Sequence, residues 1–223
     1  SFAIANGTLY TLGTRDGKEI LIALDAETGK DKGAIVVGDI LSNNWGDGPR
    51  GTPTVAGGIV YAMGGGGSLI AADSQTRVVK WKVNMSDFGG KKPGWGYCES
   101  VTVEGDQVIC TPGGSQGVMV ALRVKDGSKI WQSSGITDGA QYASILPIEH
   151  NGMRQYVQLT QQHVFGVDAQ SGKVIWKSPW EGRTAVVPTP IHKDGHVYIS
   201  SGYGVGCKLV KLENGSATEV YRN

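Results

Sequence analysis

Apolar residues occur along this chain in short runs that end at glycine, asparagine or aspartate, a pattern typical of short β-strands joined by tight turns. The stretch 52–81 shows the pattern most clearly. Its expected strands are Thr52–Val55, Ile59–Met63, Ser68–Asp73 and Val78–Trp81. Between the first two, Gly57–Gly58 supplies residues that readily adopt the positive φ of hairpin turns. The stretch therefore predicts one sheet of four antiparallel strands.

A seven-residue segment of the type Ala-x-Asp-x-x-Thr-Gly recurs five times. The copies are Ala23–Gly29, Ala71–Arg77, Ala121–Gly127, Gly166–Gly172 and Lys211–Ala217, and their first residues are 48, 50, 45 and 45 positions apart. Ten residues after the first position stands an aromatic residue in the last four copies and Gly33 in the first; the aromatic residues are Trp81, Trp131, Trp176 and Tyr221. A repeat of this length indicates an array of identical supersecondary units.

One four-stranded sheet cannot bury both of its faces, so such units pack side by side around an axis. We therefore expect an all-β, single-domain β-propeller over residues 1–223, with no helix of any size. The expected blades are 1–40, 41–90, 91–136, 137–181 and 182–223. The recurring aromatic residue is expected to fill the gap between neighbouring blades. Asp25, Asp73 and Asp168 stand in the turn before it.

The number of strands predicts an incomplete ring. Ala5–Tyr10 matches the second strand of the repeat, so the first blade is expected to lack its inner strand. The chain then holds about 4.5 blades of a larger ring. Exposed blade faces invite association. We expect a fragment, or one partner of a split propeller, whose other blades come from elsewhere.

Composition and charge exclude several classes of structure and of partner. Thirty-five glycines and 18% charged residues do not suit a helical bundle, and 39% apolar residues do not suit a disordered chain. No apolar run is long enough to span a membrane, and a net charge of +1 argues against a nucleic-acid surface. The three cysteines do not predict a disulfide framework. His192 and His196 are expected in a hairpin, where their spacing does not predict a metal site.

The repeat with its tryptophan resembles the tryptophan-docking motif of PQQ-type propellers, and Gly166–Trp176 is the best copy. The starts of the inner strands, at Pro53, Tyr97–Ser100, Tyr142–Ser144 and Pro188–Pro190, are similar to those of bacterial PQQ-binding-like repeat proteins. These include BamB-type outer-membrane-assembly propellers and polyvinyl-alcohol-dehydrogenase-like sequences. The resemblance implies that the 4.5 blades belong to a ring of seven or eight blades. The resemblance implies a periplasmic or extracellular protein of the bacterial envelope, with any export signal already removed or outside this segment.

In a propeller, the starts of the inner strands and the loops before them meet at one mouth of the central channel, a common place for a ligand. Repeat alignment places nine candidates there: Trp45, Arg50, Trp95, Tyr97, Glu99, Tyr142, Ser144, Arg183 and Thr189. Aromatic, arginine and carboxylate side chains are suited to a polar, planar or sugar-like ligand. Alternatively, Arg50, Glu99 and Arg183 form a structural ion-pair network around the axis.

Three functions remain open from the sequence. The first is a non-catalytic binding or scaffolding propeller that contacts another protein or the missing blades and holds no cofactor or metal. The second is part of a PQQ-dependent alcohol or polyvinyl-alcohol dehydrogenase, with Arg50 near the quinone carboxylates and Glu99 near calcium. The quinone enzymes carry two adjacent cysteines near the cofactor, whereas no two cysteines are adjacent in this chain. The third is a module that binds a polysaccharide or other polymer.

Overall fold

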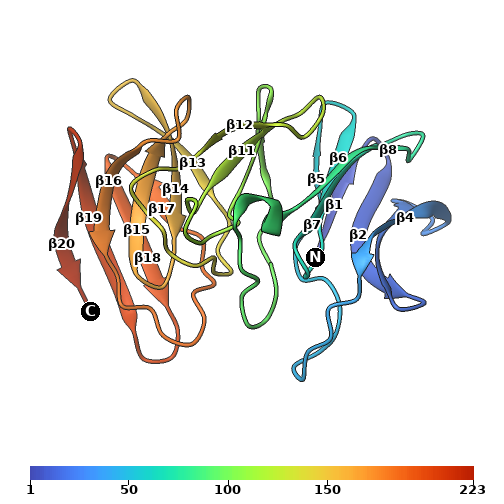
Figure 1. Ribbon diagram of the computed structural model, residues 1–223, viewed down its shortest axis with the longest axis horizontal. Helices are drawn as coiled ribbons and strands as arrows, with labels where there is room; N and C mark the ends of the chain where they lie inside the picture. Colours follow the sequence, from blue (N-terminus) through green and yellow to red (C-terminus); the bar gives the residue numbers. More distant parts are fainter.

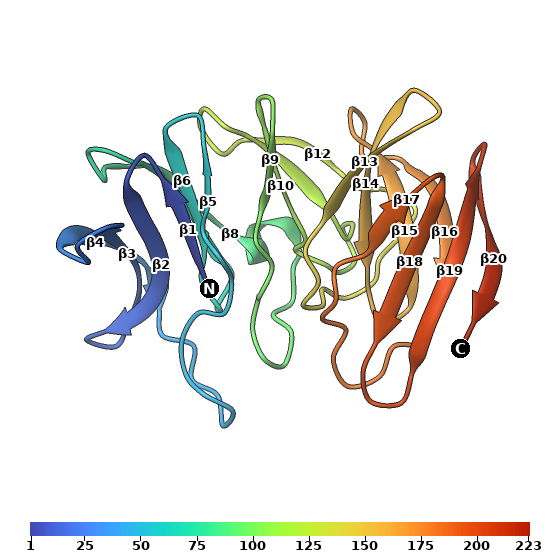
Figure 2. The ribbon, with the colours of Figure 1, turned by 180° about the vertical axis from the view of Figure 1, so that it is seen from behind.

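The computed structural model describes all residues, 1–223, and contains five four-stranded antiparallel sheets that follow one another along the molecule (Figures 1 and 2). In each sheet the strands lie in sequence order, so each is one blade. Blade 1 contains β1 (Phe2–Ala5), β2 (Thr8–Arg15), β3 (Lys18–Asp25) and β4 (Asp31–Asp39). Blade 2 contains β5 (Thr54–Ala56), β6 (Ile59–Met63), β7 (Ser68–Asp73) and β8 (Val79–Asn84).

The other three blades repeat this arrangement. Blade 3 contains β9 (Thr102–Glu104), β10 (Gln107–Cys110), β11 (Val120–Arg123) and β12 (Lys129–Gln132). Blade 4 contains β13 (Leu146–His150), β14 (Met153–Leu159), β15 (His163–Asp168) and β16 (Val174–Pro179). Blade 5 contains β17 (Ile191–Lys193), β18 (His196–Ser201), β19 (Gly206–Glu213) and β20 (Ser216–Arg222). The all-β propeller architecture predicted from the repeat is confirmed. One short helical segment, the 3-10 turn η1 (Met85–Phe88), was not expected.

The expectation that blade 1 lacks its inner strand is wrong. Residues Phe2–Ala5 form β1, which pairs antiparallel with β2 so that Ala5 lies opposite Thr8. The two residues between them, Asn6 and Gly7, both have positive φ, of 49° and 68°. A two-residue turn of this kind leaves the preceding residues in register with the following strand. The chain therefore forms five four-stranded blades.

The repeat alignment of blade 5 is also wrong, by two residues. In blades 1 to 4, β-bulges follow Ala23, Ala71, Ala121 and Gly166, the first residues of the repeats. In blade 5 the bulge follows Leu209, and Tyr221 lies opposite Leu209 rather than Lys211. Glu213 pairs with Ser216, so Asn214–Gly215 forms a two-residue hairpin in place of the longer turn of the other blades.

Four clusters of buried apolar side chains lie between successive blades. Between blades 2 and 3, for example, Tyr61, Leu69 and Trp81 pack with Val108 and Leu122. Comparable clusters join blades 1 and 2, blades 3 and 4, and blades 4 and 5. The core of this protein is therefore divided into layers, and each blade is stabilised by its neighbours.

In blades 2 and 3, the aromatic residue at the end of the blade lies on the turn of the next blade. The indole N–H of Trp81 donates to the Val124 carbonyl of blade 3 at 2.8 Å, and that of Trp131 donates to the Ala169 carbonyl of blade 4 at 3.2 Å. Each ring lies against a glycine of that turn, Gly127 or Gly172, where a Cβ atom would collide with the ring. We refer to the carbonyl and the glycine together as the seat.

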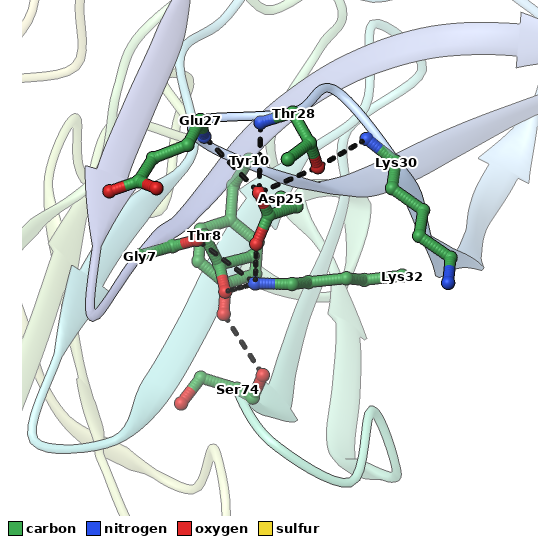
Figure 3. Close-up of polar contacts among 9 residues, drawn as sticks. All are labelled: Gly7, Thr8, Tyr10, Asp25, Glu27, Thr28, Lys30, Lys32 and Ser74. Carbon is green, nitrogen blue, oxygen red and sulfur yellow. Dashed lines mark hydrogen bonds and ion pairs between the residues drawn. The ribbon is translucent and has the colours of Figure 1, made fainter.

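Blade 1 reaches the turn of blade 2 in a different way. Gly33 stands in the position of the tryptophan, and the Tyr10 hydroxyl donates instead to the Ser74 carbonyl at 2.9 Å (Figure 3). Arg77 replaces the seat glycine, and its side chain lies 3.0 Å from where a Cβ of Gly33 would stand. Gly33 and Arg77, which both depart from the repeat, therefore lie on facing positions and compensate one another.

The two remaining aromatic residues differ from Trp81 and Trp131. Trp176 is buried in the cluster between blades 4 and 5, but its N–H donates to the side-chain oxygen of Gln155 in its own blade, at 2.8 Å. The Asn214–Gly215 hairpin offers no seat of the usual form, which explains the change of partner. Tyr221, on the outer face of blade 5, is 46% exposed.

The repeated aspartates close the turn that carries the seat. Asp25 accepts hydrogen bonds from the backbone and hydroxyl of Thr28 and pairs with Lys32 at 3.0 Å (Figure 3). These contacts lower the pKa of Asp25, the backbone hydrogen bond of Thr28 most of all. Asp73 and Asp168 accept the equivalent backbone bonds from Thr76 and Ser171. The aspartates therefore act on the local backbone.

Candidate functional site

The connections between successive blades cross one end of the molecule, opposite the hairpins that join the third and fourth strands of each blade. A cavity of about 570 Å³ lies among these connections. Nine residues line it: Trp45, Arg50, Trp95, Cys98, Tyr142, Thr184, Ala185, Val187 and Tyr203. Its size is in the range typical of ligand pockets.

Four of the nine residues predicted to line the channel mouth come together here: Trp45, Arg50, Trp95 and Tyr142. The rings of Trp95 and Tyr142 are tilted against each other, with centroids 5.6 Å apart, and the Trp95 backbone N–H donates to the Tyr142 hydroxyl at 3.3 Å. Trp45 is 83% exposed at the rim. Its loop is held by Asn43, whose side chain accepts from the Trp45 N–H and donates to the Gly94 carbonyl.

Arg50 is the charged residue of the cavity wall. Its guanidinium donates to the carbonyls of Gly46 and Gly48, at 2.6 and 2.7 Å. No carboxylate lies within 4.0 Å of it, so its positive charge has no ion-pair partner. The two hydrogen bonds to these carbonyls fix the guanidinium in place, and no acidic side chain pairs with its positive charge.

Three predicted residues lie behind the cavity wall. Tyr97 is buried and donates to the Pro112 carbonyl at 3.0 Å, and Ser144 accepts from the Ser100 N–H. Glu99 is also buried, and it accepts from the Thr111 N–H while its second oxygen has no partner. Burial raises the pKa of Glu99 to about 7. These three side chains support the loops of the site.

Arg183 and Thr189 stand apart from the cavity. Arg183 is exposed and lines a separate shallow hollow that also contains Trp180 and Arg222, while Thr189 is exposed. The alternative of an Arg50–Glu99–Arg183 ion-pair network is wrong, because none of the three forms an ion pair with another. Glu99 is directed to the backbone of Thr111 instead.

Five lining residues were not predicted: Cys98, Thr184, Ala185, Val187 and Tyr203. Tyr203 lies in the hairpin between β18 and β19, whereas the predicted residues lie at the starts of the inner strands or in the loops before them. The aromatic residue within Gly202–Gly204 is the signal that points to it.

A buried carboxylate, Glu19, was also missed. It accepts from the N–H groups of Leu41 and Gly65 and so anchors the loop that carries Trp45.

The lining is suited to binding more than to proton transfer. Burial raises the pKa of the Cys98 thiol to about 11, and burial is also the largest cause of a raised pKa at Tyr142. Both groups are therefore protonated at neutral pH, and a protonated thiol is a poor nucleophile. Arginine stays charged throughout this range. The cavity thus offers apolar rings, one fixed positive charge and a few polar groups.

The residues of this cavity do not fit a calcium-bound quinone. Calcium takes about six to eight oxygen ligands, with carboxylates prominent among them. No aspartate or glutamate lines the cavity, and the structure contains no group of three His, Cys, Asp or Glu residues placed to hold a metal. Glu99, which the resemblance puts near calcium, instead accepts a hydrogen bond from the backbone N–H of Thr111.

Five consecutive four-stranded blades, joined by aromatic contacts from one blade to the next, define a β-propeller of PQQ-like repeats. Residues 17–221 match the family described as outer membrane protein assembly factor BamB, and the chain belongs to this family. No curated protein matches the sequence.

Solved structures share the fold. BamB from Moraxella catarrhalis is 22% identical, with a TM-score of 0.60, over 94% of this chain and 57% of that one. Quinohemoprotein alcohol dehydrogenase ADHIIG from Pseudomonas putida HK5 is 14% identical, with a TM-score of 0.63, over 95% and 44%. A europium-containing methanol dehydrogenase is 14% identical, with a TM-score of 0.66, over 98% and 55%. This chain thus spans 44 to 57% of the length of these proteins. None of its helical segments is long and apolar enough to cross a membrane.

Proposed function

We propose that this chain is a non-catalytic binding module of the bacterial envelope, and that the cavity with its exposed rim contacts a segment of another protein. The observation that carries the proposal is the exposed apolar surface at the cavity. Trp45, Tyr203 and Val187 are 83%, 62% and 55% exposed around one hollow. Large exposed apolar residues gathered in one place mark interaction sites, and tryptophan, tyrosine and arginine dominate binding energy at protein interfaces.

The charge of the cavity is consistent with this role. Arg50 is held by two carbonyls and carries a positive charge with no acidic partner, so a partner carboxylate or backbone carbonyl would approach a group that is already oriented. The family description, an outer membrane protein assembly factor, supports a protein partner and an envelope location. Both are part of the proposal.

The experiment places a photoreactive amino acid at position 45 of the chain and irradiates it with envelope extract. The matched control carries the same amino acid at Val78, which is 63% exposed and lies in the region that joins β7 to β8, at the opposite end of the blades. We expect cross-linked products at position 45 that are absent at position 78 and that weaken when Arg50→Ala is added. Equal products at the two positions would contradict the proposal.

A second experiment tests catalysis directly. The chain is incubated with PQQ and calcium, passed through gel filtration and assayed for dye reduction with alcohols. We expect neither a retained quinone absorbance nor turnover, since the lining lacks carboxylates. Retention of the quinone at one equivalent would overturn the non-catalytic assignment.

A further inference from the structure

We propose that His150 and His192 together bind one divalent transition-metal ion, such as Zn²⁺, at the junction of blades 4 and 5. His150 is the last residue of β13 and His192 lies in β17, the inner strands of the two blades. Their hairpins lie at the end of the blades opposite the connections that surround the cavity. The site is therefore separate from the proposed binding surface, and both of the blades that form it have all four strands.

The two imidazole rings lie against each other across the junction. Their centroids are 6.3 Å apart, and the rings meet edge to face at 86°. A Cβ built on Gly195 would lie 3.2 Å from Cε1 of His150, the ring carbon bonded to Nε2, so this edge of the ring is directed at the hairpin between β17 and β18. Zinc–imidazole bonds are about 2.0–2.1 Å long. Rings at this separation can therefore share one ion.

The Nε2 atoms of both rings are buried, and neither has a hydrogen-bond partner. Nearly all buried polar atoms in proteins are paired, and an exception in a native structure calls for a reason such as a bound ion. Here two such atoms lie on neighbouring rings, and a single metal ion satisfies both of them. Imidazole nitrogen is a ligand suited to zinc, copper and nickel, which sets the class of ion.

The surroundings favour the neutral imidazole that a metal requires. Burial lowers the pKa of His192, and the neighbouring His150 lowers it further; Asp194 raises it, and His196 lowers it again. The backbone around the pair is also fixed. The side chain of Asn151, next to His150, donates to the side-chain oxygen of Asn214 in blade 5 at 3.1 Å. An ion would therefore meet ligands that are already positioned.

The other junctions show that the packing of the repeat does not need this pair. The residue before the first hairpin turn of a blade and the facing residue of the next blade are apolar at two junctions: Ala5 with Val55, and Ala56 with Val103. Between blades 3 and 4, Glu104 forms an ion pair with Arg154 at 2.7 Å. Blades 4 and 5 instead place two unpartnered nitrogens at this position.

The experiment is a calorimetric titration of the chain with Zn²⁺. We expect one ion per chain, and we expect His150→Ala and His192→Val each to weaken its binding at least about tenfold. Both variants should fold, because they introduce the residues found at other junctions. His196→Gln is the matched control. The strand register pairs His192 with Val197 and Lys193 with His196, so the two histidines project to opposite faces of the hairpin. The affinity of this control should be unchanged.

Thermal unfolding gives a second readout. With a chelator present, His150→Ala/His192→Val should be at least as stable as the unmodified chain, because the unpartnered nitrogens are gone. With Zn²⁺ at about 100 times its Kd, the Tm of the unmodified chain should rise by about 5 °C or more. The Tm of the double variant should not change.

The ring resonances identify the ligands directly. The chain has four histidines, and Zn²⁺ should shift the NMR signals of His150 and His192 while leaving His163 and His196 in place. A chain that binds no Zn²⁺ would overturn the proposal. So would binding that is equally tight in His150→Ala/His192→Val, which would assign the ion to other groups such as the free cysteines.

Discussion

Trp176→Ala tests whether the aromatic residue between blades stabilises the fold as the packing indicates. Trp176 is 3% exposed, and an aromatic side chain buries about 150–250 Å². At about 25 cal/mol per Å² this area corresponds to roughly 4–6 kcal/mol, close to the 3–5 kcal/mol typical of truncating a buried aromatic to alanine. The change also removes the hydrogen-bond partner of the buried Gln155 oxygen, which costs about 1–3 kcal/mol.

We therefore expect Trp176→Ala to lower the free energy of unfolding by about 5 kcal/mol. The assay is denaturation in urea followed by circular dichroism, with the slope of the transition checked for change. Tyr221→Ala is the matched control, because Tyr221 has the same register position but is 46% exposed; we expect a loss below about 1 kcal/mol. The double variant Trp176→Ala/Gln155→Leu should recover part of the loss, since no buried oxygen is left without a partner. Equal losses for Trp176→Ala and Tyr221→Ala would refute the reasoning.

Three further changes probe individual contacts. Tyr10→Phe removes the hydroxyl that donates to the Ser74 carbonyl between blades 1 and 2, and should cost about 1 kcal/mol in urea denaturation; no loss would show that this bond is not stabilising. Asp168→Ala removes the side chain that accepts from Ser171 and should cost about 1 kcal/mol, while Asp106→Ala, an exposed turn aspartate that bonds no backbone N–H, should cost less than about 0.5 kcal/mol. Burial raises the pKa of Glu99 from 4.5 to about 7, so the stability that its neutral form provides is fully present below about pH 4.5 and is lost as the pH rises toward 7, by roughly 3 kcal/mol in total. Glu99→Gln should flatten this part of the pH dependence of stability, and an unchanged dependence would show that Glu99 is not its source.

The repeat predicts the fold well because its determinants are local. Asp25, Asp73 and Asp168 bond a residue three positions on, so the turn can be recognised in the sequence alone. The inner strand of blade 1 was missed because Ala5–Tyr10 was assigned as a whole to the second strand, whereas Asn6–Gly7 is the two-residue turn between β1 and β2. Blade 5 was misaligned because Tyr221 stands ten residues after Lys211 by chance, while a shorter hairpin shifts the pairing by two residues.

The candidate site was predicted in part. Repeat alignment placed Trp45, Arg50, Trp95 and Tyr142 at one end of the blades, and they line one cavity. It did not reveal that Glu99 bonds the Thr111 backbone, because that contact depends on how a loop folds back over the next strand. Residue type alone does not separate a buried carboxylate that supports a loop from one that faces a ligand.

The central claim is that Trp81 and Trp131, at the ends of blades 2 and 3, each lie over a glycine in the turn of the next blade. The glycine amide resonances of the unmodified chain test it most directly by NMR, because the face of an indole ring shifts nearby protons upfield. We predict that Gly127 and Gly172 are shifted upfield while Gly29, with no ring over it, is not, and that Trp131→Leu returns Gly172 alone to the position of Gly29. If the three glycines have the same shifts, or if Trp131→Leu leaves Gly172 unmoved, the blades are not joined in this way.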